Sequence, residues 1–170
     1  MSDGYEGGDF ERAVALVGAE RMPRALVERL GLDWDYLSWL ALDAAAAALG
    51  AEPEQRGELV AYTGEAFTAG FLIGVHLVAE PRPAPERLAA AVDLVQVRGR
   101  HAVIADHCDL ASVARLETLY AEALVESMPR GEPERPKLLP PVTRVFEAGL
   151  AVGVEVGSGR GERNPAPQEP

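Results

Sequence analysis

Two stretches of the chain carry nearly the same residues in the same order, FTAGFLIGV at 67–75 and FEAGLAVGV at 146–154. A phenylalanine, an alanine, two glycines and a valine of the first stretch recur 79 positions later in the second. Self-similarity at a fixed spacing is the signature of a repeated supersecondary unit, so these stretches predict an internal duplication.

Other matches occur in the same order along the two halves. AVALV at 13–17 recurs as AVDLV at 91–95, and the turn Glu-Pro-Glu at 52–54 recurs at 132–134. A third match pairs Leu37, Leu40 and Ala44 with Leu116, Leu119 and Ala123. Coincidence in a chain rich in alanine and valine is the alternative interpretation, but the common order of the matches favours duplication.

The composition favours helices over sheet. Hydrophobic residues make up 48% of the chain and aromatic residues only 6%, so alanine and leucine supply much of the apolar content. Both residues lose little conformational freedom on entering a helix. We therefore predict an all-α fold, a tandem duplication of a helical unit with about four helices per copy, packed as one pseudo-two-fold helical bundle.

The expected organisation follows the duplication. Residues 1–8 and 158–170 are rich in glycine, proline or charge and are expected to be disordered. A proline-rich linker at 81–86 is expected to separate helical repeat 1, at 9–80, from helical repeat 2, at 87–157. Alternating prolines cannot continue a helix, because each lacks an N–H group and restricts the residue before it.

Turn and cap residues delimit the helices expected in each half. The first half is expected to hold helices at about 9–19, 23–31, 33–50 and 58–79, and the second at about 85–98, 101–107, 110–128 and 137–156. Asp33 and Asp109 each precede an apolar periodic run and are expected to cap the third helix of their half. The segment Asp93–Ala105 also fits two short strands around Gly99, but the duplication favours helix there.

Glycines in the last helix of each half predict a close helix crossing. In both halves two of them are one turn apart, so they share a face where another backbone can approach. Each costs about 0.5–1 kcal/mol relative to alanine, and this cost calls for a compensating contact. Alternatively, the glycines make room for tryptophan side chains or for a ligand. The expected crossing consists of Phe67, Gly70, Gly74, Phe146, Gly149 and Gly153.

Residues able to bind metals or to catalyse reactions form no recognised motif. The candidate ligands are His76, His101, His107 and Cys108, but zinc sites need four ligands in paired spacings. Bundle di-metal sites require Glu-x-x-His motifs, which are absent from the sequence, as are phosphate-binding loops and the Gly-x-Ser-x-Gly motif. No catalytic residue, cofactor or metal is therefore predicted.

The charge of the chain limits its partners. A net charge of −11 disfavours binding to nucleic acid and to anionic lipid. The most apolar run, at 66–79, is shorter than the roughly 20 residues that a membrane span needs. The single cysteine suits a reducing compartment, so we expect a cytoplasmic protein that does not bind membranes.

Three aromatic residues lie close together, and they are a possible partner surface. Trp34 and Trp39 are separated by about 500° of helical rotation, so both cannot face the core squarely, and Tyr36 lies between them. Exposed aromatics are typical of protein contacts. The leading hypothesis is therefore a non-catalytic interaction or scaffold protein that self-associates, expected to be a homodimer.

Two other functions stay open. The segments at 23–40 and 102–120 have a residue pattern typical of a helix-turn-helix, which would indicate a transcriptional regulator. The acidic opening of the expected reading helix, Asp33-Trp34-Asp35, argues against it, because DNA-reading helices present basic or amide side chains. The other alternative is a helical enzyme that binds a small molecule or a metal.

Overall fold

Every regular element in the described part of the chain is a helix. The computed structural model describes residues 23–50, 58–78, 83–128 and 135–159. The prediction of an all-helical fold is confirmed for these residues, whereas the helix predicted at 9–19 and the predicted N-terminal segment lie outside them. The elements are α2 (Pro23–Arg29), α3 (Trp34–Leu49), α4 (Glu58–Leu77), the 3-10 turn η2 (Pro85–Arg87), α5 (Leu88–Arg98), α6 (Arg100–Ala105), α7 (Leu110–Ser127) and α8 (Arg135–Ser158).

Short acidic side chains start α3 and α7. The carboxylate of Asp33 accepts a hydrogen bond from the backbone N–H of Asp35 at 2.9 Å. The carboxylate of Asp109 accepts one from the backbone N–H of Ser112 at 3.3 Å. Both predicted caps are confirmed, and each satisfies a donor that the first turn of a helix would otherwise leave unpaired.

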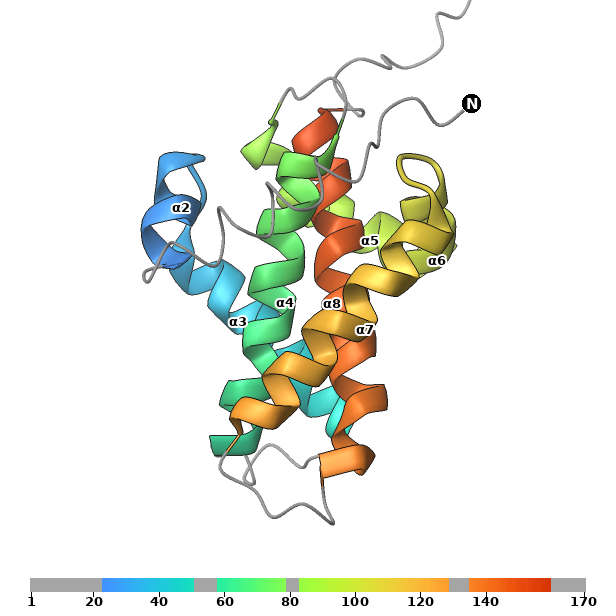
Figure 1. Ribbon diagram of the computed structural model, residues 1–170. Helices are drawn as coiled ribbons and strands as arrows, with labels where there is room; N and C mark the ends of the chain where they lie inside the picture. The colour runs from blue at the N-terminus through green and yellow to red at the C-terminus, as the bar shows by residue number, and fades with distance from the viewer. Residues whose placement is uncertain (1–22, 51–57, 79–82, 129–134, 160–170) are drawn as a thin grey trace, which may run out of the picture.

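The helices α4 and α8 lie side by side at the centre of the molecule (Figure 1). Glycines 149, 153 and 157 of α8 meet the backbone of residues 67, 71 and 75 of α4 in that order, so the two helices run in the same direction. Residues 66–75 of α4 and 149–158 of α8 are all buried. Both segments are therefore covered on every side, so polar side chains within them, such as Glu155, need partners in the interior.

The remaining helices surround this pair. The helix α3 packs against both α4 and α8, whereas α7, α5 and α6 pack mainly on α8 (Figure 1). The predicted linker at 81–86 is described only from residue 83, and there it lies against the end of α8. The N–H of Ala84 donates to the carbonyl oxygen of Val156 at 2.9 Å, and Ala84 is buried.

The segment that fitted either helix or strand is helical. Gly99 separates α5 from α6 and adopts a φ of 89°, a conformation that L side chains rarely take. Its N–H donates to the carbonyl oxygen of Val95 at 2.8 Å and so completes the last turn of α5. The prediction of helix in this segment is confirmed, and the strand alternative is wrong.

One predicted correspondence between the halves is wrong. Leu40 is buried, with 8% of its surface exposed, whereas its expected counterpart Leu119 is 61% exposed. Three of the five buried positions of α3, Leu37, Leu40 and Ala45, have buried residues of α7 76 positions later, and Asp33 and Asp109 have the same spacing. The physical reason is that the cap fixes where each helix begins, and hence which residues face the core.

Candidate functional site

The crossing of α4 and α8 is a contact between two backbones. A Cβ atom added at Gly74 would lie 2.6 Å from the carbonyl oxygen of Leu150 and 2.9 Å from the amide nitrogen of Val154. At Gly70, Gly149 and Gly153 the same test also places a Cβ closer than 3.0 Å to backbone atoms of the opposite helix. The predicted crossing residues thus lie together. The alternative in which these glycines accommodate tryptophan side chains is wrong, because their nearest neighbours are backbone atoms.

The two phenylalanines predicted for the crossing are almost completely buried. Phe67 is 4% exposed and Phe146 is 0% exposed. The ring of Phe146 stacks on that of Tyr120 from α7, with centroids 4.8 Å apart. This apolar interior leaves no free face for a ligand at the crossing, so the candidate site lies elsewhere, among polar side chains of α6, α7 and α8.

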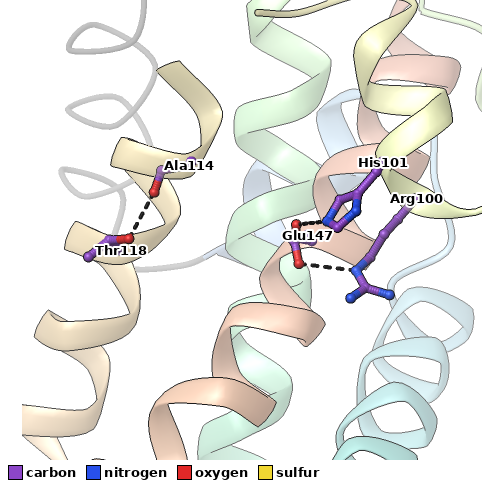
Figure 2. A network of polar contacts seen from close by, with 5 residues as sticks. All are labelled: Arg100, His101, Ala114, Thr118 and Glu147. Atoms are coloured by element: carbon purple, nitrogen blue, oxygen red, sulfur yellow. Dashed lines mark hydrogen bonds and ion pairs between the residues drawn. The ribbon is translucent and has the colours of Figure 1, made fainter. Parts of the chain in front are cut away.

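Two glutamates of α8 are buried and bind side chains near α6. Glu155 accepts a hydrogen bond from His107 at 2.7 Å, and both side chains are nearly buried. Two turns earlier, Glu147 is paired with His101 at 2.5 Å and with the Nε of Arg100 at 3.1 Å (Figure 2). These contacts fasten α6, a helix of six residues, onto the central helix. Buried carboxylates need such partners, because removing a charge from water is otherwise very costly.

A third glutamate extends this group. Glu117 of α7 has a side-chain oxygen, Oε2, that is buried and lacks a hydrogen-bond partner in the described structure. Burial and the nearby charge of Glu147 raise the pKa of Glu117 to about 8, although the positive charge of Arg100 opposes the shift. The neutral, protonated form of this carboxyl is therefore favoured by its surroundings.

A hollow lined by both charged and apolar side chains opens between α7 and α8. We call it the α7–α8 hollow; it has a volume of about 470 Å³, within the range of small-molecule sites. Arg100 belongs both to its wall and to the group around Glu147, so this one side chain joins the hollow to a buried carboxylate. Its lining residues are Arg100, Thr118, Ala121, Glu122, Leu139, Pro140, Thr143 and Arg144.

One of two adjacent prolines in α8, Pro140, forms part of a wall of this hollow. Pro140 and Pro141 lie inside α8, where neither can donate the N–H that a helix uses to bind the carbonyl four residues earlier. The sequence interpretation placed both within a helix without assigning them a role. Leu139 and Pro140 give the hollow an apolar side at its α8 wall.

The predicted aromatic surface lies on α3. Trp39 is 53% exposed and Tyr36 is 37% exposed, and their rings stack with centroids 6.3 Å apart. Trp34 is only partly exposed and packs against the core. The structure thus separates the three residues into one core-packed ring and one exposed stacked pair.

The four candidate metal ligands do not converge. His76 is exposed and hydrogen-bonds the carbonyl oxygen of Leu72 at 2.7 Å, while His101 and His107 are bound to two different glutamates. Cys108 is buried. Within the described ranges there is no group of three or more His, Cys, Asp or Glu side chains able to hold a metal ion.

Sequence reasoning missed the buried glutamates and the hollow. A glutamate in a helix is usually solvated, so the burial of Glu117 and Glu147 was not predicted, and Glu155 was considered only as the counterpart of His76. One signal was available. Glu147 and Glu155 are the only acidic residues between positions 145 and 158, a stretch otherwise made of apolar and small residues. Glutamates within such a stretch call for buried partners.

None of the helices in the ranges described above combines the length and apolarity needed to cross a bilayer. Comparisons of the chain with protein-family models, with curated proteins and with solved structures give no match.

Proposed function

We propose that the chain is an internal duplication whose halves pack about a pseudo-two-fold axis between α4 and α8. The support comes from reciprocal contacts. Gly70 faces the carbonyl oxygen of Phe146, and 79 positions later Gly149 faces that of Phe67. Likewise Gly74 faces the carbonyl oxygen of Leu150, and Gly153 faces that of Phe71. A two-fold axis parallel to both helices would exchange each of these contacts with its counterpart.

In this proposal the doubled body is a non-catalytic scaffold that presents an interaction surface on α3. The observation that carries it is the stacked pair of Tyr36 and Trp39, of which Trp39 is 53% exposed. Aromatic side chains make up only 6% of the chain, so leaving two of them at the surface forgoes much of its scarce aromatic burial. Tyrosine and tryptophan on a rigid helix are the residue types that dominate the energy of protein interfaces.

The partner we propose is a second copy of the chain, forming a homodimer in the cytoplasm. In a symmetric dimer the same patch on each subunit faces its copy, so the two aromatic pairs would cover each other. Asp35 and Asp43 of α3 are exposed near these rings, and the chain as a whole carries a charge of −11. Two such surfaces repel each other at low ionic strength, which gives the dimer a characteristic salt dependence.

Sedimentation equilibrium of the full chain tests this proposal. The dimer should be weaker at about 0.01 M salt, where the Debye length is roughly 30 Å, than at about 0.15 M, where it is roughly 8 Å. Trp39→Ser should weaken dimerisation at least about tenfold, as expected for an aromatic interface anchor. Leu119→Ser on α7, which is also an exposed apolar side chain, is the matched control and should have no effect.

Two outcomes would contradict the proposal. A chain that stays monomeric at every concentration and salt would remove self-association. A dimer that Trp39→Ser leaves intact would show that α3 is not the contact surface. The alternative of a DNA-reading protein gains no support from α3, whose exposed first turn carries Asp35 beside the capping Asp33.

A further inference from the structure

The charges around the α7–α8 hollow are arranged for a ligand that carries both signs. Arg100 and Arg144 contribute positive groups and Glu122 a negative one, although the chain has only 16 basic residues against 27 acidic ones. We propose that this hollow binds a small zwitterion, an α-amino acid with an apolar side chain. This inference goes beyond the scaffold function and does not depend on it.

Arg100 is positioned to receive a carboxylate. Its Nε donates to Glu147 at 3.1 Å, and in Figure 2 its two terminal nitrogens point away from that glutamate. A guanidinium carries five N–H donors in a planar fork, so one edge can bind Glu147 while another binds a second oxyanion. The buried Glu147 thereby holds the side chain in place, which reduces the entropy lost when a ligand binds.

Arg144 provides a positive charge that forms no ion pair with a carboxylate of the described residues. One of its terminal nitrogens donates to the backbone carbonyl of Ala48 on α3 at 3.2 Å. This acceptor is neutral, so it orients the guanidinium without cancelling its charge. Arg144 lines the α7–α8 hollow from α8, where the carboxylate of a ligand could lie between it and Arg100.

Glu122 provides the negative charge that favours a ligand with an ammonium group. It lines the hollow from α7, the helix opposite Arg144, and no ion pair joins Glu122 to Arg100 or Arg144 in the described structure. A carboxylate at this place repels a ligand with a second negative charge and attracts an ammonium group. Ala121, Leu139 and Pro140 add apolar surface for a side chain.

Isothermal titration of the full chain with three matched probes tests the inference. The probes are L-leucine, 4-methylpentanoic acid, which lacks the ammonium group, and 3-methylbutylamine, which lacks the carboxylate. L-Leucine should bind with a Kd of roughly 1 mM or below, and each analogue at least about tenfold more weakly. Similar binding of all three probes, or no heat from any of them, would overturn the inference.

Two variants test the charges of Arg144 and Glu122, and a third variant is the control. Arg144→Gln should weaken L-leucine binding at least about tenfold, because it removes a charged partner of the carboxylate. Glu122→Gln should abolish the preference for L-leucine over 4-methylpentanoic acid. Arg115→Gln removes an exposed charge of α7 outside the hollow and should change neither value. All three sites are exposed, and unchanged helical circular dichroism would verify folding. If Arg144→Gln binds L-leucine like the unmodified chain and Glu122→Gln keeps the preference over 4-methylpentanoic acid, the hollow is not the site.

Discussion

The backbone contact between α4 and α8 predicts that replacing one glycine of α4 by alanine destabilises the fold, whereas the same replacement at another glycine of α4 does not. A Cβ at Gly74 would lie 2.6 Å from the carbonyl oxygen of Leu150, whereas ordinary contact begins at 3.4 Å. The helices would have to separate locally by about 0.8 Å, the difference between these two distances. A gap of roughly 0.5–1 Å forfeits a quarter to a half of the dispersion energy of the atoms involved.

The expected magnitude follows from two opposing effects. Overpacking a well-packed interior costs about 1–3 kcal/mol, and the upper part of this range applies because the obstacle is backbone and cannot rotate away. Replacing glycine by alanine inside a helix returns about 0.5–1 kcal/mol. Gly74→Ala should therefore lower the free energy of unfolding by about 2 kcal/mol and the Tm by roughly 4–8 °C.

Gly64 is the matched control in the same helix. A Cβ there would lie 3.4 Å from its nearest neighbour, the carbonyl oxygen of Ala41, which is ordinary contact. Gly64→Ala should thus leave stability unchanged or raise it by up to about 1 kcal/mol. Thermal unfolding of both variants, followed by circular dichroism, measures the difference. If Gly74→Ala is as stable as Gly64→Ala, the close approach of the two helices is wrong.

Three further predictions concern pH, capping and backbone conformation. The pKa of Glu117 is raised in the folded state, so its contribution to stability is complete below about pH 4.5 and is lost as the pH rises through about 8. Urea titrations should therefore show that the free energy of unfolding falls as the pH rises over this window. The slope should be well below about 1.4 kcal/mol per pH unit, because the carboxyl is partly exposed. Glu117→Gln should make the free energy of unfolding less dependent on pH. Asp109→Ala removes the cap of α7 and should cost about 1 kcal/mol in the same urea titration; a loss below the error of that measurement would refute the capping role. Gly50→Ala should cost about 1 kcal/mol from strain alone, because Gly50 has a φ of 65° and open space around it, and an unchanged Tm would contradict this.

The buried glutamates show why a sequence interpretation of this chain misses its polar sites. Glu147 and Glu155 look like ordinary helix residues until α6 is placed beside α8. Their partners His101 and His107 lie 46 and 48 positions away in the sequence. No local pattern of apolar and polar residues encodes a pairing over such a separation, because it depends on how two helices pack.

The choice of which face of α7 is buried is a second feature that the sequence alone does not predict. Matching letters paired Leu40 with Leu119, but the latter is 61% exposed. Which residues of a helix face the core depends on where its cap begins the first turn and on which neighbour covers it. Only the first of these two conditions can be predicted from Asp109 and the residues that follow it.

The amino-acid sequence by itself determined the helical class, the caps at Asp33 and Asp109, and the pairs of glycines that allow a close helix contact. All of these depend on residues within a few positions of each other, where backbone hydrogen bonding and side-chain periodicity act. Only the tertiary structure decided that α4 and α8 run in the same direction, that Glu147 is buried beneath α6, and that Arg144 and Glu122 face one hollow. These features arise from contacts between distant segments, whose geometry is fixed only when the whole core packs.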